Sequence, residues 1–296
     1  MRLRDTLVSV GLPVRNGVRT LETAVRSVLA QDHERLELVI SDNASTDDTE
    51  VLCRNLAATD SRIVYHRQSR DVGILNNYIQ TIRLASGAFF RWLSDDDRLA
   101  PSCLSRCLEV FADDSRLILV TTQINYIRSD GTTYTRSYCG TTLRSNDPIE
   151  RFDEITSFLA DGMPIDPLYG LMRRAQVVTI ARRNMLGEDG VFATKLALAG
   201  PWGHVPQVLA HRHIKSEPLS VLTRRFGVPV WQAYVPTALQ CHEMLRWIRN
   251  EEFTPAQRRR ARVAVARMYV RRHYLKLTHR VRKLVRLVRS PLVMSR

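Results

Sequence analysis

Three consecutive aspartates, Asp95, Asp96 and Asp97, are the residues whose type and spacing could most directly do chemistry. They follow the apolar and aromatic run 88–94, which predicts a buried strand, and Pro101 suits the first turn of a helix. Carboxylates crowded at the end of a strand repel one another unless a cation lies among them. Mg²⁺ is usually shared between one or two carboxylates and substrate phosphates. The triplet therefore predicts either a divalent-metal site or, equally, a solvated acidic turn that caps the next helix.

The elements that must position the triplet alternate between strands and helices. Short strands separated by helices of ordinary length predict an α/β fold, with a mostly parallel sheet and helices on both faces. From apolar runs and helical spacing, strands are expected over residues 7–14, 36–40, 62–66, 89–93, 117–123 and 205–213, and helices over 20–31, 45–58, 75–84, 101–111 and 192–200.

Polar clusters follow three of these strands. Residues 13–17, Asp42 with Asn43, and the aspartate triplet all lie where a predicted strand ends. Ligands of open parallel sheets bind beyond the carboxyl ends of the strands. Three clusters at one edge favour a ligand site over an acidic turn.

Charge is distributed unevenly along the 296 residues. The chain has 44 basic and 30 acidic residues, and residues 253–296 hold fourteen Lys or Arg and no Asp or Glu. Residues 1–252 are therefore formally neutral, and the net charge of +14 comes from the tail. A boundary near Glu252 is therefore expected. We expect a main domain over 1–220, a helical connection over 221–252 and a basic amphipathic helical tail over 253–296.

Cysteine usage and apolar runs predict a cytoplasmic protein. The five cysteines form no C-x-x-C pair, and an odd number without a disulfide framework suits a reducing compartment. A strand is predicted almost at the N-terminus, without a signal peptide, and no apolar run is long enough to span a bilayer.

Several short segments occur in a fixed order: 12–17, 27–31, 37–49, Asn77 ahead of 85–87, 92–97 with Pro101, and 187–189. In this order and spacing they resemble the family 2 glycosyltransferases of the GT-A fold, over about residues 6–220. The resemblance implies an inverting enzyme with a Rossmann-like nucleotide-binding half, which uses a nucleotide-sugar donor.

The resemblance also implies a set of donor-binding residues. Asp42 and the loop 13–16 would hold the base and ribose, because a carboxylate accepts hydrogen bonds from hydroxyl and N–H groups. The alternative for Asp42 is an Asx-turn or cap ahead of the next helix. The implied nucleotide-sugar-binding residues are Pro13, Val14, Arg15, Asn16, Asp42, Asn77, Ser94, Asp95 and Arg212.

For the metal, the resemblance implies Mn²⁺ or Mg²⁺ held by Asp96, Asp97 and His213. The family's usual pattern is Asp-x-Asp-Asp, and Ser94 takes its first place here. Asp96 aligns best with the family's ligand, and Asp95 or Asp97 would complete the pair. His213 could equally be a strand-end histidine with a structural hydrogen bond, and Arg212 could pair with phosphate.

The acceptor hydroxyl needs a base within hydrogen-bond reach. The resemblance implies that Asp189 is this base, with Glu188 as the runner-up or positioning residue, in a pair that precedes the helix 192–200. The alternative is that the pair only caps this helix.

The tail predicts a helix with one apolar stripe and a basic surface. A basic amphipathic helix can lie on an anionic membrane, and we expect residues 256–289 to do so. The alternative packs the stripe on the catalytic body or on a second copy in a homodimer. The stripe consists of Val270, Tyr274, Leu277, Val281, Leu284, Val285 and Val288.

Together these features predict a metal-dependent transferase of bacterial-type surface polysaccharide or glycolipid assembly, peripheral to the inner face of the membrane. Its acceptor would be a saccharide or a lipid-linked saccharide. The alternatives are a nucleotidyltransferase-like enzyme and a non-catalytic nucleotide-sugar-binding protein. A nucleotidyltransferase would require a Gly-rich phosphate loop. Nucleic-acid binding is not expected, because the body is neutral and carries no reader motif.

Overall fold

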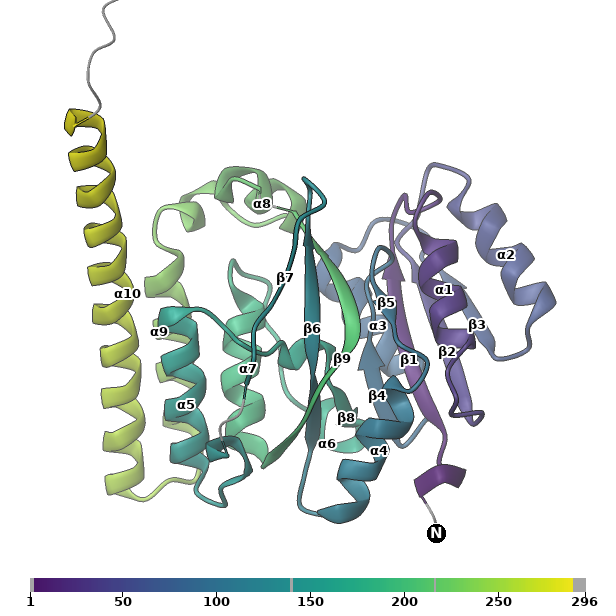
Figure 1. The fold of residues 1–296 in the computed structure, drawn as a ribbon, viewed down its shortest axis with the longest axis horizontal. Coiled ribbons are helices and arrows are strands. Elements are labelled where there is room, and N and C mark those ends of the chain that lie inside the picture. Colours follow the sequence, from purple (N-terminus) through teal and green to yellow (C-terminus); the bar gives the residue numbers. More distant parts are fainter. Residues whose placement is uncertain (1–2, 139–140, 216, 290–296) are drawn as a thin grey trace, which may run out of the picture.

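A computed structural model describes residues 3–138, 141–215 and 217–289 of the chain (Figure 1). Within these residues the strands form one sheet in the order β3-β2-β1-β4-β8-β6-β9-β5, with β7 paired to β6. The strands are β1 (Val8–Val14), β2 (Leu36–Asp42), β3 (Ile63–Arg67), β4 (Phe89–Trp92), β5 (Arg98–Leu99), β6 (Leu119–Arg128), β7 (Thr133–Thr135), β8 (Leu171–Arg173) and β9 (Trp202–Ile214).

The helices cover both faces of this sheet. Buried side chains of α1, α2 and α4 share one apolar cluster with β1 and β2, and those of α3, α5 and α7 share a second with β4 and β6. The helices are α1 (Leu21–Leu29), α2 (Thr49–Thr59), α3 (Ile74–Leu84), α4 (Cys103–Asp113), α5 (Pro148–Asp161), α6 (Arg174–Val177), α7 (Glu188–Ala199), α8 (Leu219–Phe226), α9 (Pro236–Asn250) and α10 (Pro255–Arg289).

The first half of the sheet is parallel. β1 pairs with β2 and β4, and β2 pairs with β3, all in the same direction. Every residue of β1 is buried, as expected for a strand covered by helices on both faces. Val14 lies opposite Asp42, so the loops that follow β1 and β2 open at the same edge.

The second half mixes directions and brings the aspartate triplet to the end of β9. β8 is antiparallel to β4 and β6, whereas β6 and β9 are parallel. The short strand β5 follows the triplet and pairs with β9, with Arg98 opposite His211. Because β5 intervenes and Ser102 is the N-cap of α4, the triplet does not cap that helix.

The tail helix packs on the catalytic body over its first part. Four residues of α10 are buried in one apolar cluster with α5, α7 and α9: Ala261, Ala264, Val265 and Met268. Two members of the predicted stripe, Val270 and Tyr274, are 66% and 64% exposed. The other five stripe residues have side chains outside the described residues. Residues 261–268, which precede the stripe, therefore pack on the body, and the described part of the stripe is exposed. The expected contact of the stripe with a membrane stays a prediction.

Met268→Ala should lower the free energy of unfolding by about 2 kcal/mol, because it removes a buried side chain from the contact between α10 and the body. Val270→Ala, two residues along the same helix, should change it by less than about 0.5 kcal/mol, because Val270 is exposed. Urea unfolding of both variants measures the difference. Equal, small effects would mean that the tail is not part of the cooperative folded unit.

Candidate active site

A cleft of about 980 Å³ opens at the carboxyl ends of the strands. One wall comes from the loops after β1, β2 and β4 and from α3, and the other comes from α7, α8, α9 and α10. Three of the predicted site residues do not line it: Asn16, Asp42 and Asp97. Those that do are Pro13, Val14, Arg15, Asn77, Ser94, Asp95, Asp96, Glu188, Asp189, Arg212 and His213.

Asp42 lies inside the protein rather than in the cleft. It is fully buried, and its carboxylate accepts hydrogen bonds from the Ser45 N–H at 2.9 Å and the Tyr65 hydroxyl at 2.9 Å. The bond from a backbone N–H three residues later is a local side-chain-to-backbone bond, one residue longer than an Asx-turn, and Asp48 rather than Asp42 is the N-cap of α2. These bonds give Asp42 a structural role in the loop after β2, and its predicted contact with the nucleotide stays a prediction.

Asn16 holds two loops together. Its side-chain oxygen accepts from the Thr46 N–H at 2.8 Å, and its own N–H donates to the Ser45 hydroxyl at 2.9 Å. Its φ of +54° is in the left-handed region, which asparagine tolerates better than most residues. Asn16 therefore fixes the β1 loop, and its predicted contact with the donor stays a prediction.

Asn43 and Asp71 lie in the cleft although neither was a predicted site residue. The Asn43 amide donates to Asp71 at 2.6 Å, and Arg15 forms an ion pair with the same carboxylate. Asn77 lies beside them, with its amide bonded to the Ser41 carbonyl at 2.8 Å. Asn43 directly follows a predicted strand, so the sequence carried a signal for it, whereas Asp71 is in a loop without one.

The three aspartates of the triplet point in different directions. Asp97 is 1% exposed, and its two oxygens accept from Arg212 Nε and from the His213 N–H, both at 2.9 Å. Burial raises the pKa of Asp97 to about 6, and the Arg212 charge opposes that rise. Arg212 also pairs with Asp166. Because both Asp97 oxygens are engaged inside the protein, the structure argues against Asp97 as a metal ligand.

Asp95 and Asp96 both reach the cleft. Asp95 accepts from the Thr20 hydroxyl at 3.3 Å, and a Cβ on Gly17 would lie 2.5 Å from its carboxylate, so a larger residue at position 17 would displace the Asp95 side chain. Burial, and then the neighbouring Asp96 charge, raise the pKa of Asp95. Asp96 forms an ion pair with Lys215 at 2.9 Å.

The donor set at this edge has the right chemistry for Mg²⁺ or Mn²⁺ but is incomplete. His213 Nδ1 lies 2.5 Å from the Asp96 carbonyl, which leaves Nε2 to face a ligand. Two carboxylates and one imidazole suit these ions. No group of three or more His, Cys, Asp or Glu in the described residues could hold an ion alone. The residues therefore fit an ion that substrate phosphates also bind.

Ser94 belongs to a hydroxyl cluster. Its Oγ lies 2.9 Å from the Tyr169 hydroxyl and 3.3 Å from the Tyr78 hydroxyl, and the two tyrosines are 3.0 Å apart. The family's usual aspartate at this position would place a further charge beside Asp95 and Asp96. Ser94 contributes hydrogen bonding without that charge.

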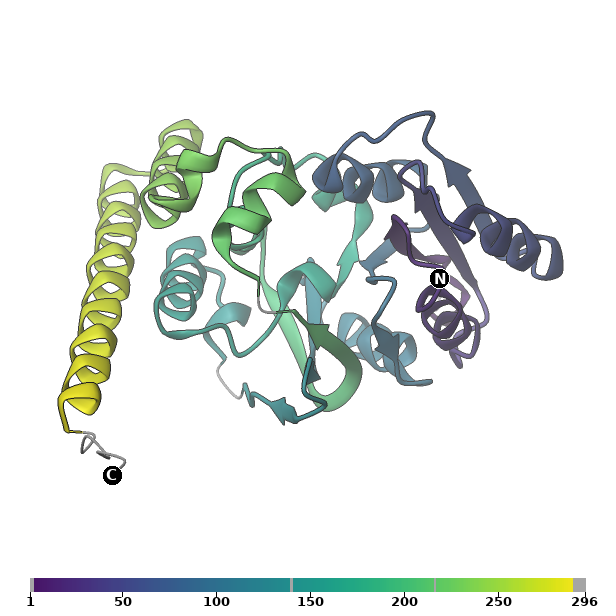
Figure 2. The same ribbon diagram turned by 90° about the horizontal axis from the view of Figure 1, so that it is seen from above.

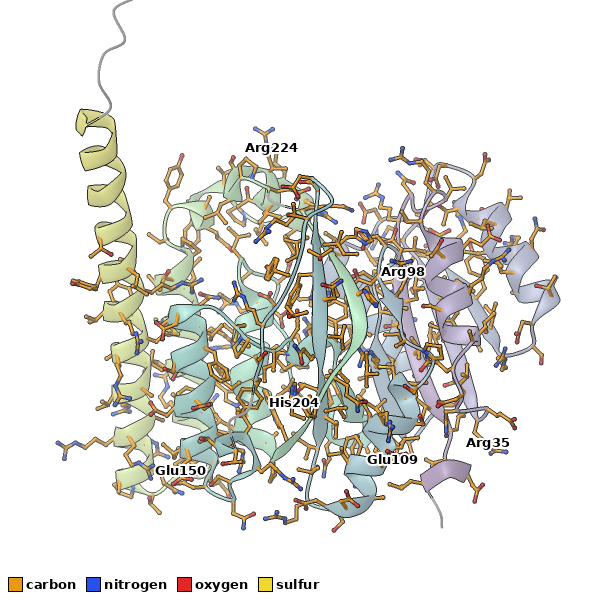
Figure 3. All side chains as sticks on the ribbon, viewed as in Figure 1. Arg35, Arg98, Glu109, Glu150, His204 and Arg224 are labelled. Atoms are coloured by element: carbon orange, nitrogen blue, oxygen red, sulfur yellow. The ribbon has the colours of Figure 1, made fainter. Side chains whose placement is uncertain are left out.

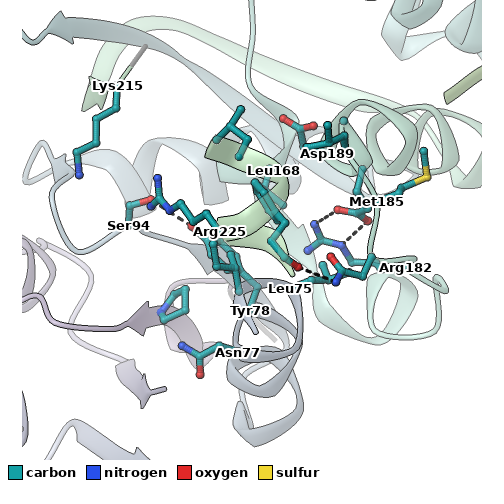
Figure 4. Close-up of a pocket in the computed structure, with 18 of the residues that line it drawn as sticks. Leu75, Asn77, Tyr78, Ser94, Leu168, Arg182, Met185, Asp189, Lys215 and Arg225 are labelled. Carbon is teal, nitrogen blue, oxygen red and sulfur yellow. Dashed lines mark hydrogen bonds and ion pairs between the residues drawn. The ribbon is translucent and has the colours of Figure 1, made fainter. Parts of the chain in front are cut away.

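Glu188 and Asp189 lie in the first turn of α7 rather than before it, and they face different surroundings. Figure 4 shows Asp189 apart from the bonds that Arg182 makes. Glu188 is buried, and Arg182 donates to both of its oxygens, one of them at 2.7 Å. The Arg182 guanidinium stacks on Phe192, 4.4 Å from the ring centre. No hydrogen bond or ion pair from any described residue reaches the exposed Asp189 carboxylate. Asp189 is therefore free to act on a substrate, whereas Glu188 is held.

Glu188→Gln should lower the free energy of unfolding by about 1–3 kcal/mol, because the neutral amide weakens a charge-assisted pair and leaves Arg182 under-compensated. Turnover of the folded variant should stay within about tenfold of the wild type, below the usual contribution of a general base. Thermal unfolding and single-turnover rates measure both effects. A larger loss of turnover at full stability would make Glu188 the base.

Sequence comparisons find relatives of known activity. The family model described as "Glycosyl transferase family 2" matches residues 9–175. Over 103 residues the chain is 37% identical to the GalNAc(5)-diNAcBac-PP-undecaprenol beta-1,3-glucosyltransferase of Campylobacter jejuni, covering 34% of this chain and 33% of that protein. The chain spans about a third of the length of the curated relatives it matches.

Solved structures show the same fold. S. aureus TarS in complex with UDP-GlcNAc superposes with a TM-score of 0.63 at 15% identity, covering 88% of this chain and 72% of that one. The mannosyltransferase PcManGT of Pyrobaculum calidifontis, in complex with GDP-Man and Mn²⁺, gives 0.57 at 16% identity, covering 88% and 73%. These likenesses confirm the predicted α/β fold of GT-A type with its mostly parallel sheet.

Proposed function

Because this chain belongs to glycosyl transferase family 2 and is a glycosyltransferase, we propose that it transfers a sugar from a nucleotide-diphosphate donor to a saccharide or lipid-linked saccharide, with inversion. One observation carries the proposal. A single cleft holds the loops after β1 and β2, the carboxylates of Asp95 and Asp96, and the unbonded carboxylate of Asp189. A bound donor, its diphosphate and an acceptor hydroxyl need these three groups.

The donor would lie along the wall formed by the loops after β1 and β2. Arg15, Asn43 and Asp71 form a linked polar group there, and Pro13 and Val14 add apolar surface. Such a group can hydrogen-bond a ribose and a base edge. The likeness to structures in complex with UDP-GlcNAc and GDP-Man supports a donor of this class.

Asp95 and Asp96, with His213, would hold a divalent cation at the diphosphate, and Mn²⁺ or Mg²⁺ suits their atoms. When bound, such an ion neutralises charge on the departing nucleotide. The protein's own residues orient this end of the cleft: Arg212 fixes Asp97, and Lys215 holds Asp96. The Mn²⁺ in the complex of the mannosyltransferase supports the choice of ion.

Asp189 would accept the proton of the acceptor hydroxyl as that oxygen attacks the anomeric carbon. A single displacement of this kind inverts the configuration. Arg182 holds Glu188 and so fixes the first turn of α7 that carries Asp189. The relative whose name includes PP-undecaprenol supports a lipid-linked acceptor.

We further propose a cytoplasmic protein at the inner face of a membrane. No helix of the described residues is long and apolar enough to cross a bilayer. Exposed Val270 and Tyr274 would insert at the interface, and the basic residues of 256–289 would meet anionic lipid. A second exposed apolar group lies at the same end of the molecule as the C-terminal end of α10 (Figure 1), and it consists of Leu219, Val221, Val230, Trp231, Tyr234 and Val235.

The paired change Val270→Asp and Tyr274→Asp should weaken binding to vesicles with 30 mol% anionic lipid by about tenfold, because it puts charge into the inserted stripe. Val263→Asp is on the same helix, and Val263 is 48% exposed. This variant adds one negative charge outside the stripe, and its vesicle affinity should stay within about twofold of the wild type. Vesicle sedimentation measures both. Analytical ultracentrifugation without vesicles measures the oligomeric state. If the paired change converted a dimer into a monomer and left vesicle binding unchanged, the stripe would be assigned to the contact with a second copy.

A panel of nucleotide-sugars tests the proposed function. With Mn²⁺ present, at least one UDP- or GDP-sugar should raise the melting temperature, and that donor should lose its sugar when an acceptor is supplied. A donor that binds without ever being turned over, against saccharide and lipid-linked acceptors alike, would indicate a binding protein. Release of inorganic pyrophosphate from a nucleoside triphosphate would indicate a nucleotidyltransferase.

A further inference from the structure

The tail helix contributes a residue to the catalytic cleft. Arg272 of α10 lines it, and its Nη1 donates to the Gln240 side chain at 2.5 Å. The Gln240 amide donates in turn to the Gly187 carbonyl at 2.8 Å, directly before Glu188 and Asp189. A hydrogen-bonded chain therefore runs from the tail through α9 to the turn that carries the candidate base.

Among the described side chains of α10, Arg272 has no acidic partner, as is also true of Arg258, Arg259 and Arg262, but it is the arginine that lines the cleft. Three other arginines of the helix pair with aspartates on or beside α5: Arg260 with Asp147, Arg267 with Asp153, and Arg271 with Asp161. In the part of the chain that the structure describes, no carboxylate lies within ion-pairing distance of Arg272. Burial lowers the pKa of Arg272, and the Asp189 charge opposes that change.

The other cations of the cleft are neutralised or point outward. Five of them have acidic partners: Arg15 with Asp71, Arg182 with Glu188, Arg212 with Asp97 and Asp166, Lys215 with Asp96, and Arg225 with Glu217. Arg224 is exposed at the outer edge of α8 (Figure 3). Arg272 is thus the partly buried guanidinium on this wall that is left to meet a ligand.

We propose that Arg272 binds an oxyanion on the acceptor, a phosphate or a carboxylate, and so holds the acceptor hydroxyl against Asp189. The inference rests on the proposed function. Arginine is suited to this task, since its planar fork binds carboxylate and phosphate with two parallel hydrogen bonds. The acceptor is the partner because Arg272 lines the cleft from α10. Figure 2 shows α10 (yellow) on the opposite side of the molecule from the N-terminal strands and helices (purple), whose loops would hold the donor.

Two pairs of probes separate the possible oxyanions. Geranyl diphosphate against geraniol tests a lipid-linked diphosphate, and a uronate-terminated oligosaccharide against its methyl ester tests a carboxylate. Isothermal titration at one ionic strength measures the binding of each to the wild type, Arg272→Gln, Arg272→Lys and Arg271→Gln. Arg271→Gln is the matched control, because it removes the same charge from the adjacent position, which faces Asp161 instead of the cleft.

The wild type should prefer one anionic probe to its neutral counterpart. Arg272→Gln should bind that probe at least tenfold more weakly, about 1.4 kcal/mol. Arg272→Lys should recover part of the loss, and Arg271→Gln should stay within twofold. Equal losses in Arg272→Gln and Arg271→Gln, or no preference for either anion in the wild type, would overturn the proposal. The nucleotide-sugar should stabilise Arg272→Gln as it stabilises the wild type. If the nucleotide-sugar failed to stabilise the wild type itself, that result would count against the proposed function and not against the role of Arg272.

Discussion

Asp189→Asn should lower kcat by about 10²–10⁴-fold and leave the affinity for the nucleotide-sugar within about twofold. Asp189 is exposed in the cleft and no described residue bonds to its carboxylate, so its lone pairs are available to an acceptor hydroxyl. Asparagine keeps the size of the side chain and removes its basicity. Because the donor loops lie on the other wall, the substitution should not disturb the site that binds the nucleotide.

The donor and acceptor are those found by the panel of nucleotide-sugars. Rapid-quench experiments with both substrates measure kcat, and titration with the donor in the absence of acceptor measures its affinity. Asp161→Asn is a suitable control, since Asp161 is an exposed aspartate that pairs with Arg271 on the tail, outside the cleft. Its turnover should match the wild type. An Asp189→Asn enzyme that turns over normally, or that loses donor affinity as severely as turnover, would contradict the assignment of Asp189 as the base.

The fold followed from the sequence because its signals are local. The alternation of strands and helices over residues 7–123 needs only hydrophobic periodicity, and the observed strands β1 to β4 lie within two residues of their expected bounds. β6 extends five residues beyond its expected end at Gln123, to Arg128. Pairing with β9 and β7 sustains that extension, and tertiary pairing leaves no mark in the periodicity of a single segment.

It was harder to predict which polar side chains reach the cleft, because adjacent residues of one segment can face opposite sides. Asp42 and Asn43 are adjacent, yet the first is fully buried and the second lines the cleft. Successive side chains of an extended segment point to opposite sides, so a shift of one position along the chain decides which of two neighbours lines the cleft. Asp95, Asp96 and Asp97 pose the same difficulty, since pairing with β9 determines which carboxylate is buried.

The partners of the site residues come from distant parts of the chain. Arg182 fixes Glu188 through a loop conformation, and Asp71 meets Arg15 across more than fifty residues. Arg272 belongs to a helix whose sequence predicted only an amphipathic tail. Amphipathic spacing defines which residues share a face, and it carries no information about what that face meets. The contribution of α10 to the cleft therefore emerged only from the structure.

Asp95→Ala and Asp96→Ala should each abolish the metal-dependent part of donor binding. At a donor concentration of 100 times Kd, binding stabilises the folded state by about 2.7 kcal/mol, and this increment should vanish in both variants as it does in wild-type protein treated with EDTA. Both carboxylates line the cleft, and a cation shared with a diphosphate needs them.

Asp97→Asn should behave differently. Asp97 is buried against Arg212, so its loss should lower the melting temperature without ligand and leave the donor increment in place. Differential scanning fluorimetry with and without Mn²⁺ compares the three variants. If Asp97→Asn lost the increment while Asp95→Ala kept it, the ion would be held by the buried aspartate, and Arg212 would have to release it when the donor binds.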